Sequence, residues 1–196
     1  MSFVDPRLVG KPIPVVSVEQ MEKERVARPA EAKGSGLAFL DQRIPGFQRE
    51  IVNLVGMGVT EAVADPNLAP KIAAPAHGFS LTYNRGMKKG HGAALHRHAT
   101  EEVFIAMTGQ WDIYWLEGET ERQVLLGPGD VVSLPIGIYR GFRNATEDLD
   151  ATLLAVVGGP DPGKVDWHPS VIEAARETGL AVDDDGNLSV QKKGQS

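Results

Sequence analysis

The chain contains no cysteine. Disulfides, thiolate nucleophiles and cysteine-based zinc sites are therefore excluded, and nothing points to an oxidising compartment. Basic residues are the minority among the charged ones, because 20 Lys and Arg stand against 26 Asp and Glu for a net charge of −6. That balance argues against a nucleic acid or an anionic membrane surface as a partner.

Long apolar runs are also missing. None approaches the roughly 20 residues that span a bilayer, and the N-terminus lacks the basic-then-apolar layout of a signal peptide. We therefore expect a cytoplasmic protein with no membrane partner. The 196 residues, 42% of them apolar, suit one soluble domain with extensions. The 22 Gly and 13 Pro favour many short strands over long helices.

Composition and apolar patterning divide the chain into three parts. Residues 1–70 are punctuated by proline, and we expect them to form an extension that packs on the body or on a partner subunit. Such an extension could cover the exposed edge of a sheet, so we expect a homodimer. Residues 71–160 alternate short apolar runs with turns, which predicts a closed or double-sheet all-β barrel. Residues 161–196 predict a short helix, opened by His168-Pro169-Ser170, and a polar tail.

The stretch from Gly90 to Gly109 carries the candidate chemistry. His96 and His98 should share one face of a strand, because side chains alternate along it. Glu102 follows at the start of an apolar run. Two imidazoles and a carboxylate that converge in an apolar interior are typical of a transition-metal site with two histidines and one carboxylate.

Two motifs resemble those of the cupin superfamily. The first has Gly90, five residues, His96-x-His98, three residues, Glu102, six residues and Gly109, and the second runs from Gly129 through Pro135-x-Gly137 to Asn144. The resemblance covers roughly residues 77–158 and implies a jelly-roll barrel, also called a double-stranded β-helix. It leaves the reaction open, because the family spans oxygenases, isomerases, epimerases and non-catalytic binding proteins.

One anchor of the second motif departs from the family pattern. In typical cupins a metal is held by three histidines and one glutamate, and the last histidine falls where this chain has Arg140. A guanidinium stays protonated and cannot ligate a metal. The first alternative is a three-ligand centre of His96, His98 and Glu102, with Fe(II) favoured over Mn, Ni or Zn. The second is a metal-free site in which Arg140 pairs with Glu102.

These alternatives lead to different functions. The sequence favours a metal-dependent, dioxygenase-like enzyme that acts on a small oxygenated or anionic substrate, with Arg140 and Glu102 as catalytic residues. The other hypotheses are a metal-free, non-catalytic cupin that binds a small molecule, and an isomerase or epimerase. We expect the pocket to be lined by Arg140, Phe104, Tyr83 and Trp111. His77 and His91 are the only nearby histidines that could replace the missing ligand.

Overall fold

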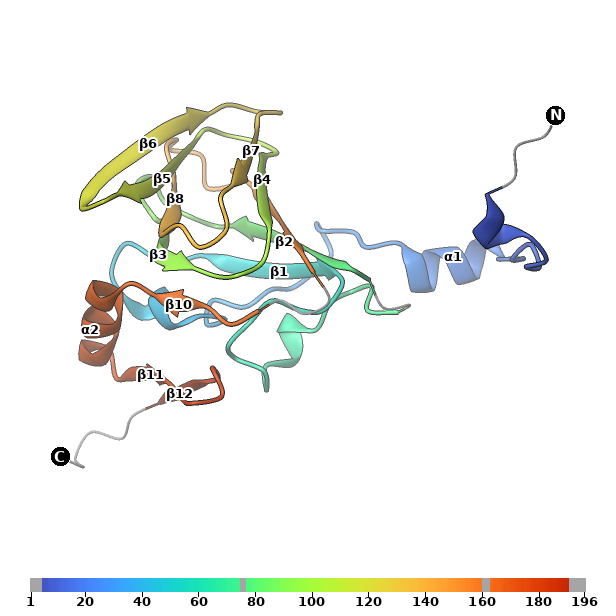
Figure 1. Ribbon diagram of the computed structural model, residues 1–196, viewed down its shortest axis with the longest axis horizontal. Helices are drawn as coiled ribbons and strands as arrows, with labels where there is room; N and C mark the ends of the chain where they lie inside the picture. Colours follow the sequence, from blue (N-terminus) through green and yellow to red (C-terminus); the bar gives the residue numbers. More distant parts are fainter. Residues whose placement is uncertain (1–4, 75–76, 160–162, 191–196) are drawn as a thin grey trace.

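The computed structural model describes residues 5–74, 77–159 and 163–190. Ten strands form two five-stranded antiparallel sheets that close into a barrel (Figure 1). The first sheet has, in spatial order, β1 (Glu50–Val55), β2 (Phe79–Arg85), β9 (Leu153–Gly158), β4 (Glu102–Ala106) and β7 (Val131–Leu134). The second has β10 (Asp166–Trp167), β3 (Gly92–Arg97), β8 (Arg140–Asn144), β5 (Trp111–Glu117) and β6 (Thr120–Leu126). This architecture confirms the predicted jelly-roll barrel.

The inward positions of the first sheet follow strand alternation. On β9, Leu153, Ala155 and Val157 are buried and the residues between them are half-buried. The same pattern on β2 buries polar residues, namely Ser80, Thr82 and Asn84. The barrel interior is therefore apolar on one wall and partly polar on the neighbouring wall, which is where a ligand can find hydrogen-bonding groups.

Two apolar clusters support the barrel. The first fills its interior around Phe104, Trp111 and Phe142, whose rings meet edge to face. In the second, Leu40 and Ile51 from the N-terminal part pack with Trp167 and the C-terminal residues. The barrel is thus held from both chain ends, because the second cluster combines segments far apart in sequence.

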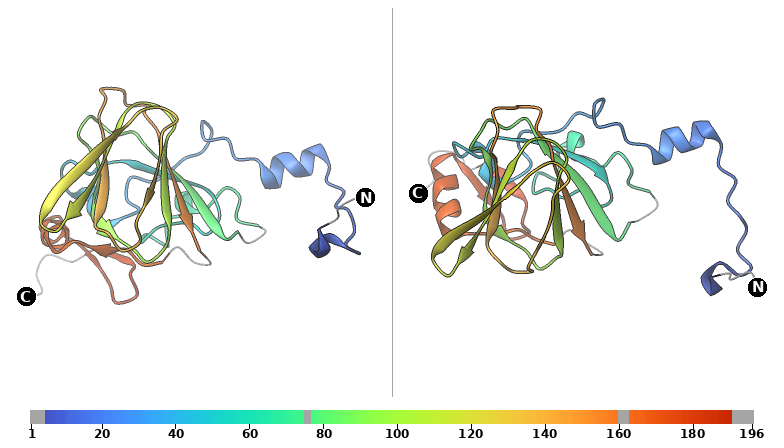
Figure 2. Two further views of the ribbon diagram at one scale, coloured as in Figure 1. Left: turned by 45° about the horizontal axis from the view of Figure 1, so that its top comes forward. Right: turned by 90° about the horizontal axis from the view of Figure 1, so that it is seen from above.

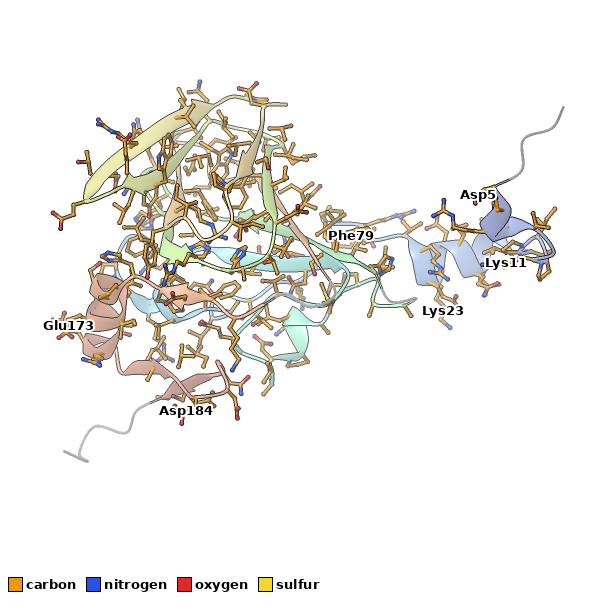
Figure 3. The ribbon with its side chains drawn as sticks, viewed as in Figure 1. Asp5, Lys11, Lys23, Phe79, Glu173 and Asp184 are labelled. Carbon is orange, nitrogen blue, oxygen red and sulfur yellow. The ribbon has the colours of Figure 1, made fainter. Side chains whose placement is uncertain are left out.

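The N-terminal arm, residues 5–25, extends away from the barrel (Figures 1 and 2). It contains the helix α1 (Val18–Arg25), in which no residue is buried. Asp5, Lys11 and Lys23 stand on it well clear of the body (Figure 3). Large apolar side chains are also exposed along it, namely Val9, Ile13, Val15 and Val18. Within the segment 1–70, residues from Glu50 onward enter the barrel as β1.

The C-terminal segment returns to the barrel before it forms a helix. Strand β10 pairs with the end of β3, and α2 (Pro169–Glu177) follows directly. His168 caps that helix with its side chain, and Gly179 follows its end with a positive φ of 76°. Beyond it, β11 (Leu180–Val182) and β12 (Leu188–Val190) form a hairpin. The end of the expected polar tail, 191–196, lies outside the described residues.

Three 3-10 turns complete the described elements: Pro6–Leu8, Leu40–Arg43 and Pro66–Leu68. Neither helix within the described ranges has the length and apolar character needed to cross a membrane.

Candidate functional site

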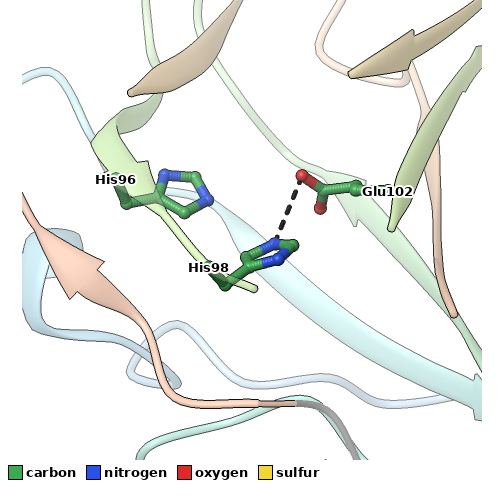
Figure 4. A group of neighbouring side chains, drawn as sticks. All are labelled: His96, His98 and Glu102. Carbon is green, nitrogen blue, oxygen red and sulfur yellow. Dashed lines mark ion pairs between the residues drawn. The ribbon is translucent and has the colours of Figure 1, made fainter. Parts of the chain in front are cut away.

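Strand geometry brings the three candidate ligands together at one end of the barrel (Figure 4). His96 lies near the end of β3, His98 follows the last residue of that strand, and Glu102 begins β4. One potential ligand atom from each side chain lies within 4.8 Å of the others. The Nε2 atom of His98 lies 3.5 Å from Oε2 of Glu102. The sequence spacing therefore places two imidazoles and one carboxylate in a single cluster.

Arg140 joins the same cluster from β8. Its Nε and Nη2 donate to Oε2 of Glu102 over 3.1 and 2.6 Å, and both side chains are buried. Nη1 donates to the backbone carbonyl of His96 over 3.0 Å, and Nη2 also contacts Nε2 of His98. Arg140 points inward because it pairs directly with His96 across the two strands. The ion pair between Arg140 and Glu102, which the metal-free alternative requires, is thus present.

The two histidines share one tautomer. Nδ1 of His96 lies 2.7 Å from the carbonyl oxygen of Ala94, and Nδ1 of His98 lies 3.1 Å from that of Thr100. A carbonyl oxygen only accepts, so the proton of His96 sits on Nδ1. In His98 the Thr100 hydroxyl also lies 2.7 Å from Nδ1, but Arg140 can only donate to Nε2, which places the proton on Nδ1 there too. Each Nε2 then carries a lone pair that can accept a hydrogen bond or bind a metal, and the lone pair of His98 already faces Nη2 of Arg140.

Burial and charge fix the protonation states in the cluster. Burial lowers the pKa of His96, and the nearby Arg140 lowers it further. Burial alone would raise the pKa of Glu102, but the charge of Arg140 holds it well below its usual value. At neutral pH the site therefore combines a neutral imidazole, a carboxylate and a guanidinium.

The donor types suit a divalent transition metal, since two imidazole nitrogens and a carboxylate oxygen form a familiar ligand set. However, not all of these ligand atoms are available to bind a metal. Nε2 of His98 and Oε2 of Glu102 are both engaged by Arg140, and a guanidinium and a divalent cation repel each other at such range. Among the described residues, only Nε2 of His96 and the second oxygen of Glu102 remain without a hydrogen bond. With Arg140 in this position, the cluster does not fit a metal ion.

A cavity opens beside the cluster, inside the barrel. It offers about 50 Å³ to the centres of water-sized molecules, and one water requires about 10–15 Å³ by that measure. It can therefore hold a small ligand. Its walls are mostly apolar, and the polar residues among them are Arg49, Thr82, Asn84, His96, His98 and Glu102.

The C-terminal segment supplies one wall of this cavity. Trp167 on β10 lines it and packs against the ring of His96 at a centroid distance of 5.4 Å. The indole Nε1 donates to Oε1 of Glu61 over 2.7 Å, which fixes the ring in place. The orientation of His96 thus depends on residues at both ends of the chain.

The structure distributes the expected pocket residues differently from the sequence analysis. Phe104 lines the cavity, whereas Arg140, Tyr83 and Trp111 do not. The guanidinium of Arg140 instead contacts Glu102, the ring of His98 and the backbone carbonyl of His96. Tyr83 faces away from the cavity, because strand alternation points its neighbours on β2 inward, and it packs on the small cluster around Val52.

Trp111 belongs to the closed apolar core, where its Nε1 donates to the carbonyl of Thr108 over 2.9 Å. His77 and His91, the two histidines that could have replaced the missing ligand, do not join the cluster of potential metal ligands in the described ranges. The missing fourth ligand is therefore not restored by another histidine of the described chain.

The cavity residues that sequence reasoning missed include Arg49, Asn84 and Trp167. Asn84 carried a usable signal, because Phe79–Arg85 places polar residues at every second position. Arg49 and Trp167 carried none, since both lie outside the two motifs and reach the cavity only through long-range packing.

Comparison with known proteins agrees with this geometry. Residues 85–157 match the family model of the Cupin domain. This segment is therefore a cupin domain, and the barrel built around it has the fold of the cupin superfamily. No curated protein matches its sequence.

Solved structures share the fold at low sequence identity. The polyketide cyclase RemF from Streptomyces resistomycificus superposes with a TM-score of 0.51 at 17% identity, over 73% of this chain and 84% of that one. A cupin 2 domain-containing protein from Halorhodospira halophila gives 0.45 at 17% identity, over 66% and 77%. The DMSP lyase DddQ from Ruegeria pomeroyi DSS-3 gives 0.42 at 23% identity, over 61% and 51%. At these identities the likeness concerns the fold alone.

Proposed function

We propose that this cupin is a binding protein for a small molecule, with Arg140 as a built-in cation in the place of a metal ion. One observation carries the proposal: the guanidinium bonds to Glu102 and to His98, which are two of the three potential ligands. A positive charge is what a buried carboxylate requires, and here the chain supplies it. No metal is then needed to hold the cluster together.

The cluster can still contact a ligand in this arrangement. The free Nε2 of His96 and the free oxygen of Glu102 can both accept hydrogen bonds from a ligand at the cavity wall. Apolar walls, among them Phe104 and Trp167, can enclose the rest of a small molecule. Arg140 acts as a positioning residue, because it orients the acceptors and does not line the cavity.

Metal content tests the proposal. After incubation with Fe(II), Mn(II), Ni(II) or Zn(II) and desalting, we expect the wild-type protein to hold far less than one equivalent. Arg140→His removes the competing cation and adds a fourth potential ligand, so it should raise the content toward one equivalent. Arg143→His is the matched control. Arg143 lies on the same strand but pairs with Glu121 outside the barrel, so this variant should gain nothing. A full equivalent of metal in the wild-type protein would refute the proposal.

A second candidate is a metal-dependent, dioxygenase-like enzyme that uses Fe(II). It is favoured by the tautomer of both imidazoles, which leaves each Nε2 with a lone pair, and by the 4.8 Å spacing of the donor atoms. In that case Arg140 would have to release His98 and Glu102. Stoichiometric iron in the wild-type protein, together with oxygen consumption in the presence of a substrate, would establish it.

A further inference from the structure

The cavity carries hydrogen-bonding groups of opposite kind at its two ends. At one end, which we name the acceptor end, His96 and Glu102 present lone pairs. At the other, which we name the donor end, stand Arg49 and Asn84. The walls between them are apolar, including Phe104, Phe142, Ala155 and Val157. Such a cavity distinguishes the two ends of an asymmetric ligand.

Arg49 has an unused donor. It is only 6% exposed and pairs with the buried Asp41 through Nη1 over 2.9 Å. The same Nη1 also donates to the carbonyls of Phe47 and Gly92. The Nε–H group is buried and has no acceptor in the described part of the chain. A buried donor without a partner is costly, so an acceptor atom from a ligand would stabilise it.

Asn84 is the second unused group. It is 5% exposed, and its backbone is paired on both sides within the sheet. Its side-chain amide makes no hydrogen bond with the residues that the structure describes. By contrast, the inward Thr82 on the same strand donates to Asn53 over 2.9 Å. The amide of Asn84 is therefore available to donate to a ligand at the same end as Arg49.

Strand register sets the distance between the two ends. Glu102 pairs with Val157 on β9, Phe104 pairs with Ala155, and Asn84 pairs with Leu153. The two ends are thus two inward steps apart, or about 13 Å along the backbone at about 3.3 Å per residue. The side chains of Glu102 and Asn84 shorten that span. The cavity suits a short chain with one polar group at each end.

Charge constrains the ligand as well. Arg140 neutralises Glu102, and Asp41 neutralises Arg49. The cavity therefore has no unpaired charge to balance a multiply charged ligand, so a zwitterion or a molecule with a single carboxylate that accepts hydrogen bonds fits it best.

We propose that the cavity binds a short-chain molecule with a hydrogen-bond donor at one end and a carbonyl or carboxylate oxygen at the other. The hydroxyl or ammonium group donates to His96 and Glu102, and the oxygen accepts from Arg49 and Asn84. This proposal rests on the proposed function, because it places the ligand in the cavity beside Arg140. Hydroxy acids and amino acids both carry this pair of groups, a hydrogen-bond donor at one end and a carboxylate at the other.

Calorimetric titration of the full chain with four matched probes tests the proposal. The two-ended probes are 4-hydroxybutanoate and 4-aminobutanoate. Butanoate lacks the donor, and butane-1,4-diol lacks the carboxylate. We expect the two-ended probes to bind at least about tenfold more tightly than the other two, because each leaves fewer buried groups without a partner. A preference for the amino over the hydroxy probe would identify a zwitterion, and the reverse would identify a hydroxy acid.

Variants of the donor end locate the binding. Asn84→Leu should weaken both two-ended probes about tenfold, whereas Asn67→Ala, on an exposed turn, should change nothing. Arg49→Lys keeps a cation beside Asp41 but removes the unpartnered Nε–H, so it should weaken carboxylate probes more than the diol. If Arg49→Lys does not fold, the affinity of Asn84→Leu for the two-ended probes alone tests the proposal.

Three results would overturn the inference: no binding of any probe by the wild-type protein, equal affinity for all four, or unchanged affinity in Asn84→Leu. Metal analysis of the same preparations separates this failure from that of the proposed function. Metal-loaded protein that still favours the two-ended probes would refute the metal-free proposal alone. Metal-free protein that does not distinguish the probes would refute only the ligand class.

Discussion

Glu61 makes the stability of this protein depend on pH. Its carboxylate is 4% exposed and accepts hydrogen bonds from the indole of Trp167 and the amide of Leu40, both over 2.7 Å. No Lys or Arg side chain donates to it among the described residues. Burial raises its pKa from 4.5 to about 7, against the opposing effect of those two hydrogen bonds. The folded protein therefore keeps a proton that the unfolded chain releases.

The direction of the effect follows from this difference. Between about pH 4.5 and pH 7 the folded state binds more protons at Glu61 than the unfolded state, so stability must fall as the pH rises. At about 1.4 kcal/mol for each pH unit, the full window amounts to about 3 kcal/mol. From about pH 5 to about pH 8.5, the loss at this one group is about 2–3 kcal/mol. In a chain of this size that corresponds to about 5–10 °C in Tm.

The substitution Glu61→Gln isolates this contribution. It removes the titration but keeps the size of the side chain, at the cost of one of the two acceptor atoms. Urea unfolding of both proteins across the pH range, followed by tryptophan fluorescence, should show the wild type losing about 2–3 kcal/mol relative to the variant. Glu119→Gln, in an exposed turn, should follow the wild-type profile. Parallel profiles for wild type and Glu61→Gln would refute the reasoning.

Two further predictions concern packing and assembly. Gly141→Ala places a methyl group against the carbonyl of Ala93 and the ring of Tyr114, so urea unfolding should show a loss of about 1–3 kcal/mol. Gly78→Ala, which meets open space, should change stability by less than about 0.5 kcal/mol. The exposed apolar residues of the N-terminal arm predict a homodimer that becomes a monomer when residues 1–25 are deleted. Light scattering measures both forms, and a full-length monomer at micromolar concentration would contradict this prediction.

The barrel could be predicted from the sequence because its determinants are local. Gly129 and Gly137, two anchors of the second motif, both have a positive φ, which glycine adopts readily in turns. The spacing of His96 and His98 on a strand places them on one face, which predicted their shared direction. Local turn chemistry and period-two alternation are readable in one sequence, so the fold class followed from them.

The cavity was harder to predict because its walls come from distant segments. Tyr83 and Trp111 were expected as walls on the basis of their aromatic character, but alternation turns the first away and core packing encloses the second. The direction of Arg140 depends on its pairing with His96 across β3 and β8. That pairing is a tertiary contact, and no pattern within either segment specifies it.

The segment that matches the family model includes only part of the cavity, and Trp167 is one of the lining residues that it leaves out. The matched segment, 85–157, contains the histidines, Glu102 and Arg140, yet Arg49, Asn84 and Trp167 lie before or after it. Two chains can therefore share the entire matched barrel and recognise unrelated molecules. The proposed donor end and the Trp167 wall both lie in the flanking segments, so a ligand cannot be transferred from a relative that matches in the barrel alone.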